Sequence, residues 1–162
     1  MTISTVSIIG AGQMGAGIAQ TVAVGGYQVS LYDVAPERAV QAQAAVAASL
    51  ARQVARGLID QAAADAAVGR ITTAASLAEV ARADLIIEAA SEEEAVKTGI
   101  LGELSSILPE HTILASNTSS ISITRLGAAA KRPDRVIGLH FMKPAPTMKL
   151  VEIVRGIATS DA

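Results

Sequence analysis

The chain has 162 residues, of which 51% are apolar and 17% charged, and its formal net charge is -2. These values predict one globular domain with a real core, and they give no expectation of a nucleic-acid partner or a membrane span, which needs roughly 20 apolar residues. Cysteine is absent, which excludes disulfides and agrees with a cytoplasmic location, and two histidines are too few for a usual zinc site, so no metal is expected.

Short β-branched runs alternate with alanine-rich helical stretches along the chain. This alternation predicts an α/β fold with a doubly wound, mostly parallel sheet and helices on both faces. We expect strands at residues 3–9, 28–33, 70–73, 84–88, 112–116, 135–140 and 149–154. Helical segments separate all of these strands except the last pair, which favours right-handed crossovers. The longest predicted helix runs from Pro36 to about Arg56, and Gly57 stops it.

A glycine-rich turn follows the first predicted strand and opens a helix predicted at 14–24. Gly10 permits the tight turn, Gly12 lets a pyrophosphate approach the main chain, and Gly15 lets the helix pack closely on the strand. The helix amino terminus then offers unpaired N–H groups to phosphates, including those near Gln13 and Met14. This G-x-G-x-x-G pattern in this context predicts a dinucleotide site.

Asp33 ends the second predicted strand, 18 positions after Gly15, where its carboxylate can accept both ribose hydroxyls of an adenosine. Its charge would repel a 2′-phosphate and therefore favours NAD over NADP. The alternative role is a cap for the helix that begins at Pro36.

Polar residues follow the fourth and fifth predicted strands. Ser116, Asn117 and Ser119 stand at the carboxyl end of a strand, the edge where open α/β sheets bind ligands, while Ser120 or Ser122 can cap the next helix. The acidic run 92–94 reads mainly as a complement to a helix dipole, although one member can reach a cofactor.

Three residues of the long helix are a weaker candidate site. Arg52 and Arg56 lie one turn apart, with Ser49 nearby, and could reach the phosphates of a large acyl carrier.

His140 and Glu152 end the pattern, separated by two prolines in the segment HFMKPAPTMKLVE. Folding back at the prolines would bring the two side chains together. A carboxylate on one imidazole nitrogen fixes the tautomer and supports a positive ring, as a catalytic proton acceptor requires. The final segment, GIATSDA, is predicted to be a tail or the start of a linker.

Taken together, GAGQMGAGIAQ, Asp33, IIEAASEEEAVK, SNTSS and HFMKPAPTMKLVEIV resemble the amino-terminal domain of the L-3-hydroxyacyl-coenzyme A dehydrogenases, of the bacterial 3-hydroxybutyryl-coenzyme A type. The resemblance covers essentially the whole chain, residues 1–162. It implies a Rossmann-like NAD-binding domain and hydride transfer between NAD and C3 of a 3-hydroxyacyl-CoA in fatty acid or butyrate metabolism.

The resemblance also implies roles for individual residues. His140 is the expected catalytic base, Glu152 pairs with it, and Ser119 bonds the reacting oxygen of the substrate. The expected cofactor contacts are Gly10, Gly12, Gln13, Met14, Gly15, Asp33, Glu92, Lys97 and Asn117.

Two features depart from the family pattern. Met142 and Lys143 stand where the family usually has phenylalanine and asparagine, so no asparagine contact is carried over. The family continues into a helical carboxyl-terminal domain that supplies the dimer interface, part of the substrate groove and a catalytic asparagine, and that domain is absent here. We therefore expect a fragment of a two-domain enzyme that binds cofactor but turns over acyl substrate poorly or not at all.

Two alternative functions remain at this level. A related β-hydroxyacid dehydrogenase would act on a free hydroxy acid, but such enzymes usually take their base from a lysine on a later helix. A dinucleotide-sensing module without chemistry would need neither His140 nor Glu152.

Overall fold

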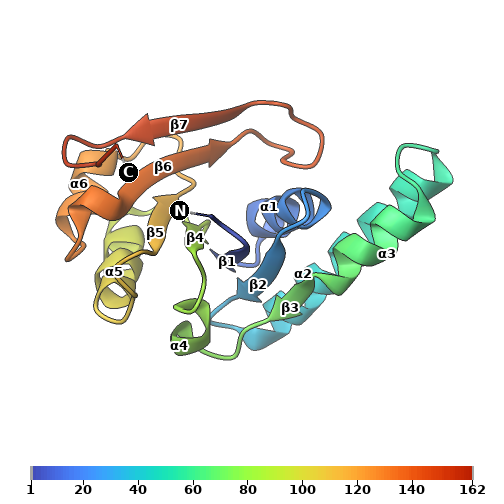
Figure 1. The fold of residues 1–162 in the computed structure, drawn as a ribbon, viewed down its shortest axis with the longest axis horizontal. Helices are drawn as coiled ribbons and strands as arrows, with labels where there is room; N and C mark the ends of the chain where they lie inside the picture. The colour runs from blue at the N-terminus through green and yellow to red at the C-terminus, as the bar shows by residue number, and fades with distance from the viewer. Residues whose placement is uncertain (1, 162) are drawn as a thin grey trace.

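The structure is a computed structural model that describes residues 2–161, shown in Figure 1. Its helices and strands in chain order are β1 (Thr5–Ile9), α1 (Gln13–Val24), β2 (Gln28–Tyr32), α2 (Pro36–Ala55), α3 (Gln61–Gly69), β3 (Ile71–Thr73), α4 (Leu77–Val80), β4 (Leu85–Glu88), α5 (Glu94–Ser105), β5 (Ile113–Ser116), α6 (Ile123–Ala128), the 3-10 helix η1 (Pro133–Arg135), β6 (Val136–Phe141) and β7 (Val151–Arg155).

The strands form one sheet in the order β3-β2-β1-β4-β5-β6-β7. The first six strands are parallel and β7 runs antiparallel to β6. The chain leaves β1 toward β2 on one side and returns to β4 on the other, so the winding direction reverses beside β1. Ligands of such sheets bind at this reversal, outside the carboxyl ends of the strands. The predicted doubly wound, mostly parallel sheet is confirmed.

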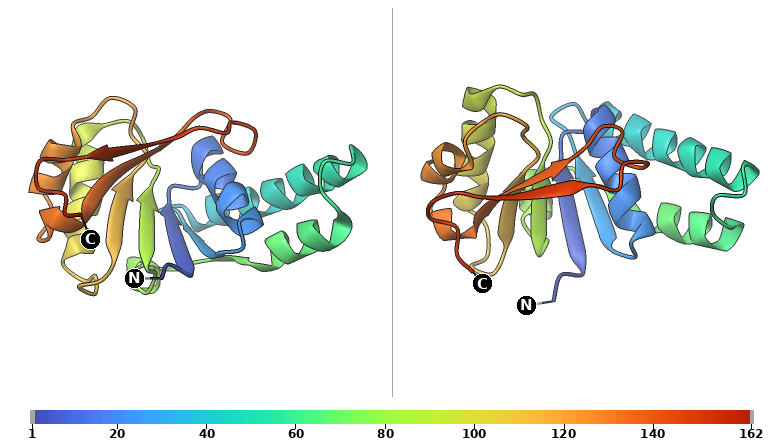
Figure 2. Two further views of the ribbon diagram at one scale, coloured as in Figure 1. Left: turned by 45° about the horizontal axis from the view of Figure 1, so that its top comes forward. Right: turned by 90° about the horizontal axis from the view of Figure 1, so that it is seen from above.

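Helices cover both faces of the sheet, as Figure 2 shows from two further directions. One core layer packs β1 and β2 against α1, α2 and α3, with Ile8 and Ile18 fully buried. The other packs the opposite face against α4, α5 and α6 through Ile86, Leu101 and Leu126. The central strands are apolar on both faces because helices cover both, which explains their continuous rather than alternating apolar runs.

The first strand begins at Thr5, two residues later than the sequence predicted, because Asp84 binds the chain just before it. Oδ2 of Asp84 accepts hydrogen bonds from the N–H groups of Ser4 and Thr5, both at 2.9 Å, and from their hydroxyls at 3.0 and 2.8 Å. The two N–H bonds and the Thr5 hydroxyl hold the pKa of Asp84 far below its ordinary value, against a small opposing effect of burial.

Replacing Asp84 with asparagine is expected to make folding stability less dependent on pH in the acid range. The carboxyl group has a lower pKa in the folded protein than unfolded, so its stabilisation is complete above the unfolded value of about 3.9 and declines as pH falls toward the folded value. Urea unfolding at neutral pH and at about pH 2.5 should show a large deficit for Asp84→Asn that narrows in acid. Asp65→Asn, on the exposed face of α3, is the matched control. An equal deficit at both pH values contradicts the prediction.

Helices α2 and α3 pack side by side and extend past the edge of the sheet (Figure 1). The buried residues of α2 recur every three or four positions, from Ala39 through Val46 to Leu50, so one face of the helix enters the core. Arg56 caps this helix and Gly57 follows with a φ of 67°, as predicted. No helix within residues 2–161 is long and apolar enough to cross a membrane.

Residues 159 and 160, near the end of the described chain, bond to the segment around β6. Thr159 donates its hydroxyl to the carbonyl oxygen of Val136 at 2.6 Å, and the N–H of Ser160 donates to that of Asp134 at 3.0 Å. The sequence predicted a tail or the start of a linker here, and the described residues are instead held against the sheet by hydrogen bonds that a composition argument cannot reveal.

Candidate active site

A cleft of about 810 Å³ lies at the carboxyl ends of β1, β2, β4, β5 and β6. Its volume is within the range of about 300–1,000 Å³ that small-molecule sites occupy. The predicted site residues that line it are Gly10, Gly12, Gln13, Met14, Asp33, Glu92, Asn117, Ser119 and His140. Sequence positions far apart therefore meet in one cavity.

The glycine turn has the geometry that its sequence predicted. Gly10 has a φ of 97°, and a Cβ there would lie 2.6 Å from the carbonyl oxygen of Ala89. A Cβ on Gly15 would lie 1.7 Å from the carbonyl oxygen of Gly10, so the third glycine allows helix α1 to pack against the turn without lining the cleft itself. Only glycine fits at these two positions.

The turn also fits a dinucleotide phosphate group. A Cβ on Gly12 would meet nothing within 4 Å, so the main chain there faces open space in the cleft. Gly12 is the N-cap of α1 and has no side chain to occupy the helix N–H groups, and the first turn contains no acidic residue. Unpaired N–H groups and the positive end of the helix dipole favour an anion at this point.

Asp33 also lines the cleft, beside the glycine turn, and is only 7% exposed. Oδ2 accepts the N–H of Ala11 at 2.8 Å and Oδ1 accepts that of Ala35 at 3.1 Å. Asp33 bonds the N–H of Ala35 but is not the N-cap of α2 considered as an alternative, because the N-cap is Ala35 itself, which makes no side-chain cap hydrogen bond. Asp33 fixes the glycine turn and still has lone pairs for ribose hydroxyls.

Glu92 connects two loops that line the cleft. Oε1 accepts hydrogen bonds from the hydroxyl of Thr118, from the N–H of Ser119 at 3.1 Å and from the hydroxyl of Ser120 at 3.2 Å. Partial burial acts to raise the pKa of Glu92, but the Thr118 hydrogen bond and the charge of Lys97 outweigh it, so the pKa lies below its ordinary value. The carboxylate is therefore ionised at neutral pH.

Lys97 does not line the cleft. Its side chain is fully buried, and Nζ lies 2.9 and 3.0 Å from the two carboxylate oxygens of Glu88, which is also fully buried. The contact between Lys97 and cofactor remains a prediction, but the geometry favours an indirect role, because other protein groups already surround the ammonium.

Asn117 joins three strand ends. Its N–H donates to the carbonyl oxygen of Glu88 at 2.8 Å, and its side-chain Oδ1 accepts the N–H of Phe141 at 2.8 Å. The Asn117 side chain also lines the cleft, so its amide N–H₂ group remains available to a ligand. Ser119 lines the same wall, and its hydroxyl makes no side-chain hydrogen bond within residues 2–161. Ser122, not Ser120, caps α6.

His140 and Glu152 face each other directly across the antiparallel pair β6 and β7. Nδ1 of His140 lies 2.9 Å from Oε2 of Glu152, so the predicted close approach is confirmed. Ala145, in the proline-containing loop between the two strands, is buried and would lie 3.3 Å from a Cβ on Gly17, so this loop packs on α1. Because Glu152 occupies Nδ1, Nε2 is the ring nitrogen left for a ligand of the cleft that His140 lines.

Ser49, Arg52 and Arg56 lie on the second half of α2, outside the cleft. Both arginines are exposed and none of the three joins His140 in one cavity. Their proposed contact with an acyl carrier stays a prediction. Lys143, in contrast, lines the cleft near His140 and brings a cation to the place where the family has an asparagine.

The sequence reasoning missed the apolar wall of the cleft on the α4 and α5 side. Leu77, Val96 and Ile100 line this wall. Arg38, from the first turn of α2, also lines the cleft. The spacing of Val96 and Ile100 by one helical turn was a visible signal for a shared face. Their exposure to a cleft rather than to the core could not be read from that spacing.

The parallel sheet, the glycine turn at α1 and the acidic residue closing β2 define a dinucleotide-binding domain of the dehydrogenase class. The chain belongs to the family of the 3-hydroxyacyl-CoA dehydrogenase NAD binding domain, whose model matches residues 5–162.

Similar proteins are named as dehydrogenases of particular 3-hydroxyacyl-CoA substrates. The 3-hydroxybutyryl-CoA dehydrogenase of Bradyrhizobium diazoefficiens is 50% identical over 99% of this chain and 55% of its own length. The 3-hydroxyadipyl-CoA dehydrogenase of Escherichia coli is 44% identical over 99% of this chain and 34% of its own length. The crystal structure of (S)-3-hydroxybutyryl-CoA dehydrogenase from Ralstonia eutropha superimposes with a TM-score of 0.95 at 44% identity, covering 99% of this chain and 56% of that one.

The chain thus spans about half the length, or less, of the curated relatives it matches. These comparisons show the family and the NAD-binding fold.

Proposed function

We propose that the protein is an NAD-dependent oxidoreductase that interconverts the C3 hydroxyl and the C3 ketone of a 3-hydroxyacyl-CoA, with 3-hydroxybutyryl-CoA or acetoacetyl-CoA as the substrate pair. The observation that carries this proposal is the 2.9 Å contact between His140 and Glu152 at one end of the dinucleotide cleft. A module that only senses a dinucleotide has no need of a paired imidazole beside its redox end.

His140 is the proposed proton acceptor. Glu152 accepts the Nδ1 hydrogen and fixes the tautomer, so that Nε2 carries the lone pair that takes the proton from the 3-hydroxyl group. The positive ring that results lies beside the Glu152 carboxylate, which lowers its energy. The Ser119 hydroxyl is the proposed donor to the substrate oxygen, and bound NAD supplies the acceptor for the hydride from C3.

Substrate class is tested by comparing initial rates with 3-hydroxybutyryl-CoA and free 3-hydroxybutyrate in the complete native protein. The proposal expects reduction of NAD with the thioester and little with the free acid. Faster turnover of the free acid would favour a β-hydroxyacid dehydrogenase, and tight NADH binding without turnover of either would favour a sensing module.

Replacing Asp33 with asparagine is expected to weaken NADH binding by at least about tenfold, because each charged hydrogen bond that the variant loses to a ribose hydroxyl is worth about 1.5–3 kcal/mol. NADPH binding should weaken less or improve, because the repulsion of the 2′-phosphate is removed. Fluorescence titration with both cofactors measures the ratio, with Asp65→Asn as the control. A wild-type protein that binds NADPH as tightly as NADH contradicts the assignment.

The family resemblance supports three wider proposals. Residues 1–162 form one cofactor domain of a two-domain enzyme, a second, helical domain completes the acyl-CoA groove, and that domain forms a homodimer interface. The absence of cysteine is consistent with a cytoplasmic enzyme of fatty acid or butyrate metabolism. The mass of the native polypeptide tests the first of these proposals.

A further inference from the structure

We propose that Glu88 and Lys97 are positioning residues that act through Glu92 to hold the 118–120 turn of the cleft in its working geometry. The proposal depends on the function above only for its catalytic readout. It gives Lys97 a role inside the protein instead of a direct contact with cofactor.

The position of Lys97 supports an internal role. Its side chain is fully buried in α5, and Nζ contacts both oxygens of Glu88, Oε2 of Glu92 at 3.4 Å and the carbonyl oxygen of Ala90 at 3.4 Å. An ammonium has three hydrogens, and these four oxygens account for all of them. Lys97 is also not among the residues that line the cleft.

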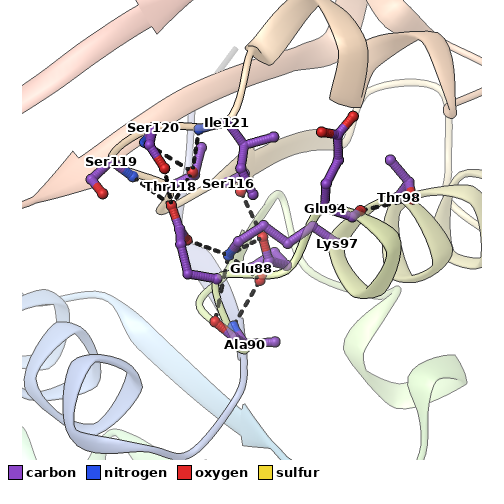
Figure 3. A network of polar contacts seen from close by, with 11 residues as sticks. Glu88, Ala90, Glu94, Lys97, Thr98, Ser116, Thr118, Ser119, Ser120 and Ile121 are labelled. Atoms are coloured by element: carbon purple, nitrogen blue, oxygen red, sulfur yellow. Dashed lines mark hydrogen bonds and ion pairs between the residues drawn. The ribbon is translucent and has the colours of Figure 1, made fainter.

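Glu92 links Lys97 to the 118–120 turn. One of its oxygens, Oε2, faces Lys97, while the other, Oε1, accepts from Thr118, Ser119 and Ser120. Figure 3 shows Lys97 and Glu88 together with the turn that carries Thr118, Ser119 and Ser120. Because Glu92 is partly exposed and follows a loop, its side chain needs a second attachment to hold one orientation, and Lys97 supplies it.

Glu88 anchors the network to the sheet. It is the last residue of β4 and fully buried, and besides Lys97 it accepts the N–H of Ala90 at 2.7 Å and the hydroxyl of Ser116 at 2.6 Å. Burial of an ammonium is costly unless it pairs with such a carboxylate. The network therefore ties the turn to the ends of strands β4 and β5. The positions of these two strand ends set the position of the Ser119 hydroxyl.

The double variant Glu88→Gln/Lys97→Met tests the proposal because it removes both buried charges together. Replacing both members of a buried ion pair by neutral side chains of similar size costs little stability, whereas removing one leaves an unpaired buried charge. We expect near-normal thermal unfolding, at least about tenfold faster hydrogen exchange at the Ser119 amide, and unchanged exchange at the Ala74 amide, which bonds to Leu31. Thr98→Val is the matched control, because the Thr98 hydroxyl bonds only within α5.

Catalysis supplies the second readout. The double variant and Glu92→Gln should each lower kcat/KM, and their combination should be no worse than the more damaging of the two, because they act through one carboxylate. Multiplying effects would mean that Lys97 acts separately on the cofactor, and that result overturns the proposal. Normal Ser119 exchange in a folded double variant also overturns it.

One measurement needs no variant and no substrate. NMR titration of the Glu92 carboxyl carbon in the wild-type protein is expected to give a pKa below the ordinary value, because the hydrogen bond from Thr118 and the charge of Lys97 together outweigh the effect of burial. A pKa at or above the ordinary value overturns the proposal even if the double variant does not fold. Amide exchange and this titration stay informative if the protein proves inactive on every thioester, so failure of the function and failure of the network are distinguishable.

Discussion

Replacing His140 with glutamine in the complete native protein is expected to lower kcat by about 100- to 10,000-fold, the usual contribution of a positioned general base. Glutamine keeps a polar side chain of similar reach but cannot take a proton at neutral pH. NADH affinity should change little, because the proposed pyrophosphate and ribose contacts are Gly12, at the amino terminus of α1, and Asp33, after β2, and neither is on the strand that carries His140.

The other histidine offers the control. His111 is exposed and lies 3.8 Å from Asp84. Asp84 binds the chain at the amino-terminal end of β1, whereas the cleft lies at the carboxyl ends of the strands. His111→Gln should therefore keep normal turnover. Stopped-flow measurement of hydride transfer, alongside fluorescence titration of NADH, separates the chemical step from binding. If His140→Gln keeps more than about a tenth of the wild-type rate of hydride transfer, His140 is not the base.

Replacing Glu152 with glutamine should have a smaller effect than replacing His140. In Glu152→Gln the amide can still contact Nδ1 at the observed position, but no negative charge stabilises the positively charged ring. The same stopped-flow assay should show slower hydride transfer than in the wild-type protein, without the near-complete loss expected for His140→Gln.

Replacing Gly12 with valine is expected to abolish measurable cofactor binding while the domain stays folded. The affinity should fall by well over tenfold, which is a loss of more than about 1.4 kcal/mol in binding free energy. Gly12 has φ −72° and ψ −171°, an extended conformation that valine adopts easily. A Cβ there touches nothing, so the new side chain fits the protein and fills the space where a pyrophosphate would approach.

Two further glycine variants make this result interpretable. Gly69→Val, on the exposed end of α3 where a Cβ also meets nothing, should leave NADH binding intact. Gly15→Val should instead unfold the protein, because its Cβ would overlap the carbonyl oxygen of Gly10 at 1.7 Å. Isothermal titration with NADH and thermal unfolding measure both quantities. Normal NADH affinity in folded Gly12→Val would mean that the dinucleotide lies elsewhere.

The sequence by itself determined the sheet, the glycine turn and the acidic end of β2. Its predicted strands overlap all those found, and most bounds differ by one or two residues, because buried parallel strands leave compact β-branched runs between helical segments. Gly10 and Gly15 were identifiable because a positive φ or a close approach allows one residue type. The approach of His140 to Glu152 followed from a local hairpin with prolines in its loop.

Tertiary structure alone decided how the polar residues between these landmarks are used. In the sequence, Lys97 is one charged residue of a helix among several, yet packing of α5 against the end of β4 buries it against Glu88. The same packing turns Glu92 toward Ser119, and the projection of α2 past the sheet takes Arg52 away from the cleft. Burial and pairing of a side chain depend on surfaces brought together from distant positions, and local patterns carry no record of which surfaces meet.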